Sequence, residues 1–465
     1  MRDMTKTMPQ PASAQLRDDL KSRGVKYFFG AYVDIHGVPK SKAVPIDHLE
    51  SALAGSELYT VGALEGMGEL GPNEDECEGR PDMRNVTVLP WDRRFAIAPA
   101  ELLLHDAPYT HDSRYVLRRQ IEAAAELGYE FNMGIEPEVY VLREEEGGKV
   151  VPFVVEDCHN APTRGYDLEA TMLADPFLAP MVEYINELGW DVYSFDHEGG
   201  DGQYEFDFRY CDGLQMADRM LVFRLMAKHV ARTIGCFATF MPKPFVDSFA
   251  SGAHLNMSLA DADGVNMFAA GDSPSAARAG RDPGYTDLAY HFTAGILRHA
   301  DAITAVACPT VNSYKRLLPH GFMREITWAP VYAAYGENNR TLMCRLPVNR
   351  RAVELRTADA GCNFYLVTAL TLAAGLEGIR EQLDPGDPVN EDTYKIMENH
   401  EERDSLRRLP RTLGEAVDAF EADALARGVF GDEFHATYVA YKRAEWETYN
   451  TIVTEWERQQ YLRLW

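Results

Sequence analysis

The first 110 residues alternate short apolar stretches with turn-forming residues, and this pattern predicts a small sheet. Residues 26–45 run apolar and aromatic up to a turn at Asp34-Ile35-His36-Gly37 and then return, which indicates a β-hairpin. Residues 86–99 form a second strand-rich stretch, and residues 112–128 show helical periodicity that closes on a glycine. We therefore expect a domain boundary near His111, between a domain of residues 16–110 and one of residues 111–465.

The longer remainder of the chain alternates strand-like and helical segments. The strand-like segments are residues 129–142, 190–198, 203–209, 253–259, 341–346 and 352–356. The helical patterns cover residues 213–232, 286–307 and 364–382, and an amphipathic helical stretch covers residues 413–464. Strands mixed with long helices in this way are typical of an α+β domain.

Composition narrows the class of protein. The chain has 465 residues, of which 46% are hydrophobic, enough for a large core. It contains no run of about 18 apolar residues and its first residues lack the apolar run of a signal peptide, so we expect a cytoplasmic protein without membrane contact. The formal net charge of −26 argues against nucleic acid or an anionic membrane as partner, because both would repel the chain. The seven cysteines never form Cys-x-x-Cys, which argues against a thiolate zinc site.

Acidic residues recur in pairs on the predicted strands. Glu136 and Glu138 are two residues apart, so on a strand both point to the same face. Such a pair repels and is usually neutralised by a cation or by a shared proton, although alone it could be a solvated strand face. Glu198 and Glu205 flank a glycine-rich turn, where the backbone can pass close to a bound group.

Two further strands add a histidine and a fifth glutamate. His254, Asn256 and Ser258 alternate and therefore share one strand face. Glu354 and Arg356 share the face of another strand, an arrangement that could also be an ordinary salt bridge. Together the five glutamates and one histidine form an oxygen-rich set that suits magnesium or manganese rather than zinc. Paired metal ions that clamp phosphate oxygens are common in phosphoryl transfer, which makes that chemistry plausible here.

A series of blocks along the chain resembles the glutamine synthetase family, and the match extends over nearly the whole sequence. The blocks are Glu136-Pro137-Glu138, His197-Glu198, Gly202-Gln203-Tyr204-Glu205, Phe240-Met241-Pro242-Lys243-Pro244, Ser251-Gly252-Ala253-His254, Asn312-Ser313-Tyr314-Lys315-Arg316, Asn339-Arg340, Glu354-Leu355-Arg356 and Asn363-Phe364-Tyr365-Leu366. The resemblance implies a small β-grasp-like N-terminal domain and a catalytic domain built on a curved antiparallel sheet with flanking helices. It also implies a homododecamer of two stacked hexameric rings, with each active site between neighbouring subunits.

The resemblance further implies an ATP-dependent ligase that binds two or three Mg²⁺ or Mn²⁺ ions per active site. The metal-binding residues would be Glu138, Glu198 and Glu205 for one ion and Glu136, His254 and Glu354 for the second. In the implied reaction the γ-carboxylate of glutamate attacks the terminal phosphate of ATP. An amine then displaces phosphate from the γ-glutamyl phosphate and leaves an amide.

Arginines would bind the charged substrates, because their planar fork pairs with carboxylate and phosphate oxygens at two points. By the resemblance, Arg316 and Arg356 would bind glutamate beside Glu138, and Arg340 and Arg345 would steady the transferred phosphate. Arg316 and Arg340 would therefore take part in catalysis.

The nucleotide pocket would be lined by Tyr210, Asn256 and Ser258. Ala352 stands where the family often has an ATP-contacting arginine, and Arg351 or Arg350 could take that role.

The chain departs from the family on the amine side of the site. Ordinary glutamine synthetases carry a flap with Pro-Gly-x-Glu-Ala-Pro, whose glutamate helps to deprotonate ammonium. Here Trp328 stands at that position, and Glu325 could act as the amine base or be a solvated loop residue. The N-terminal aspartate that assists ammonium is absent, with Glu65 as a possible substitute. Tyr166 matches a residue beside the amine pocket.

The Thr-Trp-Ala-Pro flap resembles the branch of the family that contains γ-glutamylmethylamide synthetases. We therefore predict that L-glutamate is joined to methylamine, because Trp328 would pack against the methyl group. Ammonia as in an ordinary glutamine synthetase, another amine such as ethylamine or a polyamine, and a non-catalytic structural or sensing role are the alternatives. One methyl group in an apolar pocket contributes only about 1–3 kcal/mol, so some activity with ammonia is expected as well.

Overall fold

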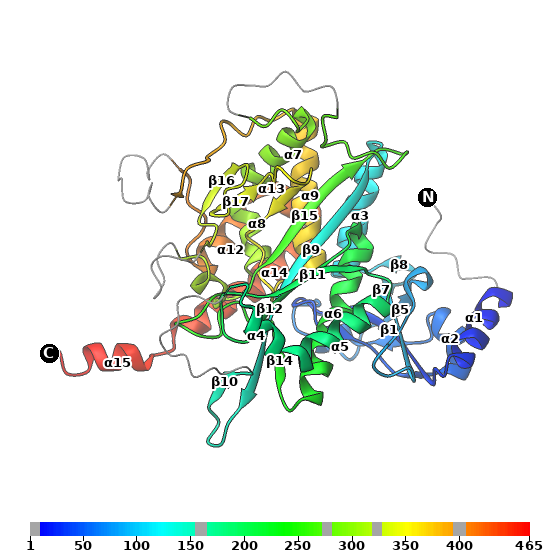
Figure 1. Ribbon diagram of the computed structural model, residues 1–465. Helices are drawn as coiled ribbons and strands as arrows, with labels where there is room; N and C mark the ends of the chain where they lie inside the picture. The colour runs from blue at the N-terminus through cyan, green and yellow to red at the C-terminus, as the bar shows by residue number, and fades with distance from the viewer. Residues whose placement is uncertain (1–9, 154–164, 272–280, 319–327, 394–405) are drawn as a thin grey trace.

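Two β-sheets flanked by helices make up the computed structural model, which describes residues 10–153, 165–271, 281–318, 328–393 and 406–465 (Figure 1). The first sheet lies near the N-terminus of the chain. The second, larger sheet runs through the middle of the molecule and carries most of the helices.

The N-terminal sheet has the strand order β2-β1-β7-β5-β4, with β3 paired to β1 and with β6 and β8 paired to β7. Its strands are β1 (Tyr27–Val33), β2 (Pro39–Lys40), β3 (Val44–Pro45), β4 (Leu58–Tyr59), β5 (Cys77–Pro81), β6 (Thr87–Val88), β7 (Phe95–Leu104) and β8 (Ala107–Pro108). The predicted hairpin is confirmed, since Tyr32 pairs with Lys40 across the turn. Helices α1 (Gln10–Ser22) and α2 (Leu49–Leu53), which the sequence pattern did not predict, accompany the sheet.

The larger sheet, here called the catalytic sheet, has the order β11-β12-β9-β15-β18-β17-β16, with β10, β13 and β14 paired to β9. Its strands are β9 (Glu130–Glu144), β10 (Val150–Pro152), β11 (Val192–His197), β12 (Gln203–Phe208), β13 (Cys211–Asp212), β14 (Phe237–Thr239), β15 (Ala253–Ala260), β16 (Tyr332–Gly336), β17 (Leu342–Arg345) and β18 (Val353–Leu355). All six predicted strands are present. Among the described pairs of this sheet, all are antiparallel as expected except one, because β16 runs parallel to β17.

The helices of the larger part are α3 (Ser113–Glu126), α4 (Leu168–Leu173), α5 (Asp175–Glu187), α6 (Gly213–Thr233), α7 (Asp287–Arg298), α8 (Ala300–Ala307), α9 (Phe364–Glu381), α12 (Leu413–Ala422), α13 (Ala424–Phe430), α14 (Asp432–Asn450) and α15 (Glu455–Tyr461). Helix α3 begins where predicted, because the Asp112 side chain accepts hydrogen bonds from the backbone N–H groups of Arg114 and Tyr115. The single helix predicted for residues 286–307 is in fact two helices, which meet at His299.

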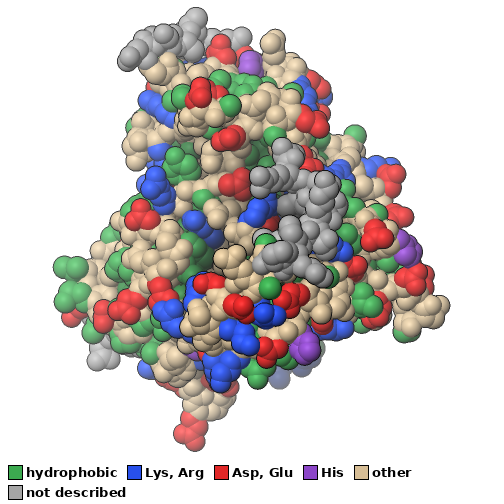
Figure 2. Space-filling model, turned by 90° about the vertical axis from the view of Figure 1, so that its right-hand side faces the viewer, with side chains coloured by type: hydrophobic (Ala, Val, Ile, Leu, Met, Phe, Trp, Pro, Cys, Tyr) green, Lys and Arg blue, Asp and Glu red, His purple; other side chains and the backbone are tan. Residues whose placement is uncertain are grey.

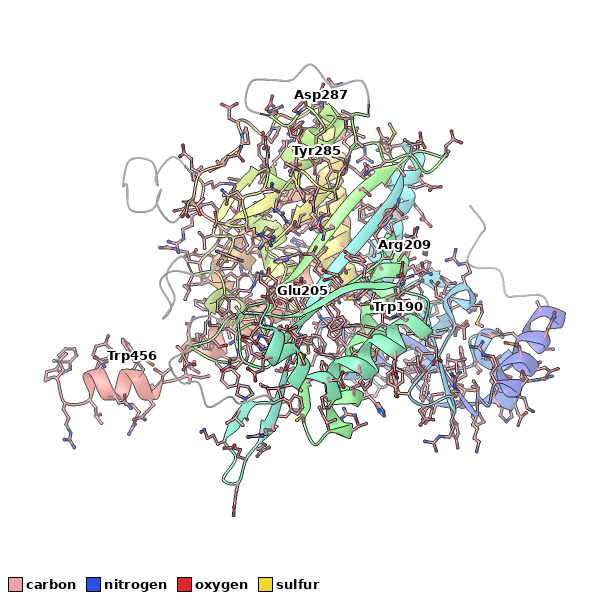
Figure 3. The ribbon with its side chains drawn as sticks, in the orientation of Figure 1. Trp190, Glu205, Arg209, Tyr285, Asp287 and Trp456 are labelled. Carbon is pink, nitrogen blue, oxygen red and sulfur yellow. The ribbon has the colours of Figure 1, made fainter. Side chains whose placement is uncertain are left out.

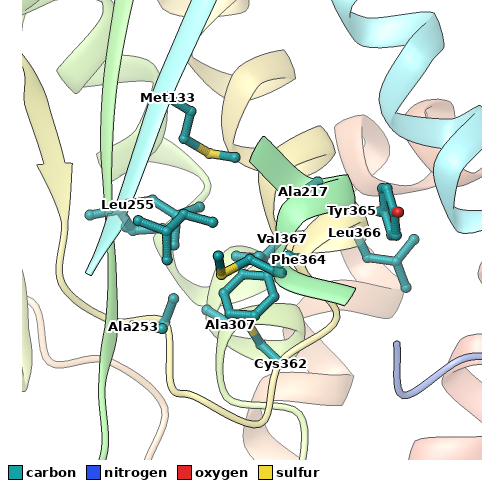
Figure 4. Packing of buried hydrophobic residues seen from close by; sticks show 14 of the residues in the cluster. Met133, Ala217, Ala253, Leu255, Ala307, Cys362, Phe364, Tyr365, Leu366 and Val367 are labelled. Carbon is teal, nitrogen blue, oxygen red and sulfur yellow. The ribbon is translucent and has the colours of Figure 1, made fainter. Parts of the chain in front are cut away.

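The main core lies beneath the catalytic sheet (Figure 4). Met133 on β9 and Leu255 on β15 are buried against side chains of α6 and α9, such as Ala217 and Val367. Because side chains alternate along a strand, the positions next to these apolar residues point to the opposite face. That face carries Glu136 and the other polar residues that the sequence analysis singled out.

The surface carries charges of both signs. On the face drawn in Figure 2, acidic and basic side chains are interspersed rather than gathered into one patch. Within the described residues, none of the helices combines the length and the apolar character that crossing a membrane requires.

His299 sits between two carboxylates at the junction of α7 and α8. Its Nδ1 lies 2.7 Å from Asp423 Oδ2, and its Nε2 contacts Glu377 Oε2. Burial disfavours the charged imidazole, but the two carboxylates outweigh burial and raise the pKa of His299 above its usual value.

This raised pKa predicts a stability contribution that depends on pH. A group whose pKa is raised by folding stabilises the fold fully below its unfolded-state pKa, about 6.5 for histidine, and the contribution is lost as pH rises through the folded-state pKa. We expect His299→Gln to lower the free energy of unfolding by about 1–3 kcal/mol near pH 6, the usual value of charged hydrogen bonds. Thermal unfolding between about pH 6 and 9 should show a smaller decline in the variant than in the unaltered protein. Parallel curves for the two proteins would contradict the prediction.

Candidate active site

Five neighbouring strands of the catalytic sheet, β11, β12, β9, β15 and β18, bring the predicted metal-binding residues together. In the strand register Glu138 on β9 lies opposite Glu205 on β12, and Glu136 lies opposite His254 on β15. On the next strand, Glu354 lies opposite Asn256. Glu198 follows directly after β11. We call this set the carboxylate cluster: Glu136, Glu138, Glu198, Glu205, His254 and Glu354.

Within the carboxylate cluster, two groups of three residues can each surround one ion. One group is Glu136, His254 and Glu354, and the other is Glu138, Glu205 and His254. In each group the candidate ligand atoms lie within 4.8 Å of one another. His254 thus stands at the boundary between the two groups, and five of the six predicted ligands meet in space.

The electrostatics of the carboxylate cluster are those of a site with too much negative charge. Burial, and then the neighbouring Glu138 and Asp196, raise the pKa of Glu198 to about 8. Burial together with Glu136 and Glu198 raises the pKa of Glu205 well above its usual range. A divalent cation would relieve this repulsion, and the donor set of carboxylates plus one imidazole fits Mg²⁺ or Mn²⁺.

Glu354 has the opposite environment. Burial would raise its pKa, but Arg356, His254, Arg345 and Arg350 outweigh burial and hold the pKa well below the usual range. Arg345 Nη1 lies 2.7 Å from Glu354 Oε2, and Arg350 Nη2 lies 3.1 Å from the same oxygen. Arg350 Nη2 also lies 2.8 Å from Glu136 Oε1, so it bridges the two carboxylates.

Two hydrogen-bond donors hold the Glu138 carboxylate, and the sequence analysis assigned a role to neither of them. Gln203 Nε2 donates to Glu138 Oε2 over 2.8 Å, and the backbone N–H of Gly252 donates to the same oxygen over 2.9 Å. Gln203 is buried and its own Oε1 accepts from the Gly200 N–H. The sequence did contain a signal for Gln203: it is two residues from Glu205 on β12, so both side chains lie on the same face of the strand.

Gly252 lies where a side chain would collide with the site. A Cβ atom there would be 2.9 Å from both Arg316 Nη2 and Glu138 Oε1, and 3.2 Å from His254 Nε2. We expect Gly252→Ala to fold, because these atoms are side-chain ends, yet to lose about 100-fold or more in kcat, since a displacement of about 1 Å at a catalytic group can have that effect. Steady-state kinetics beside a thermal unfolding curve would check this. Unchanged turnover would contradict the prediction.

The four predicted substrate-binding arginines gather beside the carboxylate cluster. Arg316 Nη1 and Nη2 donate to the carbonyls of Thr357 and Arg356 over 2.8 and 2.9 Å, and both arginines are buried. Arg356 Nε donates to the carbonyl of Arg340. The backbone of residues 340–357 therefore fixes where these guanidinium groups stand.

A cavity of about 420 Å³ opens beside Glu136 of the carboxylate cluster, and we call it the nucleotide cavity after the ligand that the sequence analysis predicts for the residues lining it. The predicted residues Tyr210, Asn256, Ser258 and Arg351 all line it, together with Glu136 and Arg350. The guanidinium of Arg351, however, pairs with Asp282 and lies over the ring of Tyr285. The Tyr285 hydroxyl lies 2.8 Å from the carbonyl of Arg350 and 3.0 Å from that of Ala352, and its one proton can be donated to either, which holds this loop in place.

The residues predicted for the amine side are less completely assembled. Trp328 and Arg340 line a second cavity of about 520 Å³, with the guanidinium 5.9 Å from the indole ring. Trp328 and Tyr166 both have positive φ, 36° and 65°, a strained conformation that is often found at functional sites. Glu65 is engaged elsewhere in the chain, since it accepts a hydrogen bond from the Tyr441 hydroxyl. Glu325 lies outside the described residues.

Comparisons with known proteins agree with this geometry. The model of the glutamine synthetase catalytic domain matches residues 110–461. The chain is 37% identical over 457 residues to a glutamate–methylamine ligase of Methyloversatilis universalis, covering 97% of this chain and 99% of that protein. It is 36% identical over 440 residues to a glutamine synthetase of Rhizobium meliloti, covering 94% and 97%. A solved structure of GmaS in complex with ADP superposes with a TM-score of 0.87 at 32% identity, covering 96% and 99%.

The fold, the carboxylate cluster and these comparisons define a ligase that forms carbon–nitrogen bonds. The chain belongs to the glutamine synthetase family, and its two-sheet architecture is the glutamine synthetase fold. The resemblance read from the sequence is thereby confirmed.

Proposed function

We propose that the chain joins the γ-carboxylate of L-glutamate to methylamine and converts ATP to ADP and phosphate. The observation that carries this proposal is that the carboxylate cluster adjoins two cavities. Glu136 lines the nucleotide cavity, and Arg345 joins Glu354 to Asn338, which lines the cavity of Trp328. The similarity to a glutamate–methylamine ligase supports the choice of amine.

In this proposal the carboxylate cluster holds two divalent ions, with a third as a further possibility at the phosphates. Glu136, His254 and Glu354 bind one ion, and Glu138, Glu198 and Glu205 bind the other. When bound, Mg²⁺ or Mn²⁺ neutralises charge on the phosphate oxygens and makes the terminal phosphate easier to attack.

The arginines do the rest of the positioning. Arg316 and Arg356 pair with the carboxylates of glutamate and direct the γ-carboxylate toward the phosphate. Arg340 and Arg345 hold the phosphoryl group as it moves. Because Glu354 already holds the Arg345 guanidinium, little reorganisation of Arg345 is needed during the reaction.

We also propose that Arg350, rather than Arg351, replaces the family arginine that is missing at Ala352. Arg350 bridges Glu136 and Glu354 at the edge of the nucleotide cavity, whereas Arg351 is engaged by Asp282. Arg350→Ala should lower kcat/KM for ATP by about 100-fold, a typical loss for one electrostatic group in a phosphoryl-transfer site. Arg351→Ala is the matched control and should change kcat/KM for ATP less than tenfold. The reverse order of effects would restore Arg351 to the role.

The methyl group of the amine is proposed to pack against Trp328, with Tyr166 on the opposite side. Burial and the nearby Glu198 raise the pKa of the Tyr166 hydroxyl, while Arg340 opposes them, so Tyr166 is within electrostatic reach of both residues, which supports this proposal. Glu325 is proposed as the amine base, and Glu65 as a residue that serves the site of a neighbouring subunit.

A homododecamer of two hexameric rings remains part of the proposal, as do a cytoplasmic location and a domain boundary near His111. Helix α15 supports self-association, because it extends away from the body and carries exposed aromatic side chains, including Trp456 (Figure 3). A second copy would cover them. Light scattering coupled to size-exclusion chromatography would measure the assembly.

The function is tested by phosphate release from ATP in the presence of glutamate and magnesium, with methylamine, ethylamine or ammonia. We expect kcat/KM to be highest for methylamine, by about 10–200-fold over ammonia, the range for one methyl group in an apolar pocket. Trp328→Ala should reduce this preference. A preference for ammonia in the unaltered protein would identify an ordinary glutamine synthetase, and no turnover with any amine would indicate a non-catalytic member.

A further inference from the structure

The two carboxylate oxygens of Glu138 have different environments. Gln203 Nε2 and the backbone N–H of Gly252 both donate to Oε2, over 2.8 and 2.9 Å. A carboxylate oxygen has two lone pairs, so these two donors occupy the whole accepting capacity of Oε2. Oε1, in contrast, accepts no hydrogen bond from any residue that the structure describes. Oε1 is therefore the oxygen of Glu138 that is left to bind an ion.

The other two carboxylates proposed for the same ion are not restricted in this way. The Glu205 carboxylate accepts no hydrogen bond within the described part of the chain. Glu198 Oε2 accepts one hydrogen bond, from the N–H of Gly199 over 3.3 Å. Both residues can therefore offer one oxygen or two, and Glu138 is the carboxylate whose mode of binding the protein itself fixes.

The Gln203 carboxamide is held in one orientation. Gln203 is buried on β12, its Oε1 accepts the N–H of Gly200 over 3.1 Å, and its Nε2 also donates to the carbonyl of Ala250 over 3.2 Å. If the amide were turned over, Oε1 would face the Glu138 carboxylate and Nε2 would face the Gly200 N–H. Both contacts would be repulsive, because each would join two acceptors or two donors. Gln203 therefore acts on Glu138 only as a donor.

The second donor, the N–H of Gly252, is fixed by the backbone. The Glu138 N–H donates to the Gly252 carbonyl over 3.2 Å, while the Gly252 N–H donates to Glu138 Oε2. Gly252 belongs to the segment before β15, whereas Gln203 belongs to β12. Two different parts of the catalytic sheet thus hold the same oxygen, and the carboxylate cannot rotate to exchange Oε1 and Oε2 without breaking both hydrogen bonds.

We propose that Gln203 is a positioning residue that makes Glu138 bind its ion through Oε1 alone, and that it thereby favours Mg²⁺ over Ca²⁺. Mg²⁺ requires a nearly ideal octahedron of ligands, whereas Ca²⁺ takes about six to eight oxygens and accepts both oxygens of one carboxylate. Withholding Oε2 removes a ligand that Ca²⁺ would use and Mg²⁺ would not. This inference rests on the proposed metal site of Glu138, Glu198 and Glu205, and adds to it the residue that selects the ion.

Competition for Mn²⁺ measures this selectivity without any turnover. Free Mn²⁺ gives an electron paramagnetic resonance signal, so its displacement from the full-length protein by Mg²⁺ or Ca²⁺ yields a Kd for each ion. Gln203→Met removes the donor and keeps a side chain of similar length. We expect Gln203→Met to lower the ratio of Kd for Ca²⁺ to Kd for Mg²⁺ at least about tenfold, because loss of the hydrogen-bond partner of a metal ligand usually changes metal affinity by about 10–100-fold.

Tyr140→Phe is the matched control. Tyr140 is buried and lies opposite Gln203 in the strand register, and its hydroxyl donates to the carbonyl of Phe249 over 2.7 Å. The substitution therefore loosens the same segment before β15 but removes no hydrogen bond to Glu138. We expect an unchanged ratio of the two Kd values in this variant. An equal fall of the ratio in Tyr140→Phe and Gln203→Met would assign the effect to the loosened segment and overturn the role of Gln203.

An unchanged ratio in a folded Gln203→Met protein would overturn the inference and leave the proposed metal site standing. Absence of Mn²⁺ binding by the unaltered protein would contradict the metal site itself, and the inference with it. If Gln203→Met does not fold, the infrared carboxylate bands of the unaltered protein decide. Bands that are missing from Glu138→Gln belong to Glu138, and the separation of their antisymmetric and symmetric stretches distinguishes binding through one oxygen from binding through two. Binding of Mg²⁺ or Ca²⁺ through both oxygens of Glu138 would overturn the inference.

Discussion

Replacing Glu138 with alanine is expected to abolish ATP-dependent product formation, with a fall of at least about a thousand-fold in kcat/KM. Glu138 is buried, lies opposite Glu205 in the sheet and belongs to one of the two groups that can surround an ion. Loss of a metal ligand removes the charge neutralisation on which phosphoryl transfer depends, and this is usually the largest electrostatic contribution in such a site. Phosphate release with saturating metal, glutamate and methylamine is the measurement.

The same substitution should leave the fold largely intact. Without bound metal, Glu138 raises the pKa of Glu198, so removing the Glu138 carboxylate relieves repulsion between the two groups. The same change removes one hydrogen-bond acceptor from the N–H groups of Gln203 and Gly252. These effects oppose each other, and we expect an unchanged assembly in size-exclusion chromatography.

A matched control lies on the same strand. Glu144 is at the exposed end of β9, and Glu144→Ala should retain full activity. Glu138→Gln keeps the acceptor for Gly252 but removes the charge, so it separates metal binding from packing. Substantial turnover by Glu138→Gln or by Glu138→Ala would remove Glu138 from the metal site.

The sequence predicted the parts of this site that depend on strand alternation. Because Glu136 alternates with buried Ile135 along β9, and His254 with Leu255 along β15, one apolar face implied one polar face. Alternation along one strand does not determine the register, that is, which residues of two neighbouring strands lie opposite each other. That Glu136 lies opposite His254, 118 residues further along the chain, follows only from how the two strands pair.

The same reasoning explains what was missed. Arg350 and Arg351 are adjacent, and the pattern offered no basis to choose between them, since that choice depends on the position of Asp282 and on the loop held by Tyr285. The backbone N–H of Gly252 could not be anticipated as a partner of Glu138 for a similar reason. The break at His299 escaped the helical periodicity because the hydrophobic spacing continues across it.

Among the substitutions considered, replacement of Arg114 is expected to lower the stability of the fold most. It is fully buried and pairs with three carboxylates at once, with Nη2 2.8 Å from Asp82, Nη1 3.0 Å from Glu101 and Nε 2.9 Å from Asp218. Glu101 belongs to the N-terminal sheet, whereas Asp218 belongs to α6 of the catalytic part. Arg114 therefore links the N-terminal sheet to helix α6 through a single guanidinium.

Arg114→Met should lower the free energy of unfolding by about 3–5 kcal/mol, the usual effect of leaving buried charges without their partner. Denaturant unfolding followed by circular dichroism is the measurement. Arg119→Met, on the same helix but with its guanidinium at the surface, is the control and should change the free energy by less than about 0.5 kcal/mol. A loss below about 1 kcal/mol in Arg114→Met would contradict a structural role for this network.

The pH dependence of the free energy of unfolding of Arg114→Met shows whether the loss comes from buried carboxylates without a partner or from lost packing. Burial raises the pKa of Asp218 and Arg114 opposes it, so without Arg114 the pKa of Asp218 would rise further above its unfolded value. Asp218 would then favour the folded state at low pH and oppose it as pH rises. The deficit of Arg114→Met relative to the unaltered protein should therefore be smaller near pH 5 than near pH 8, and Asp218→Asn combined with Arg114→Met should recover part of it. A deficit that is independent of pH would instead assign the loss to the cavity left by the side chain, since packing does not titrate.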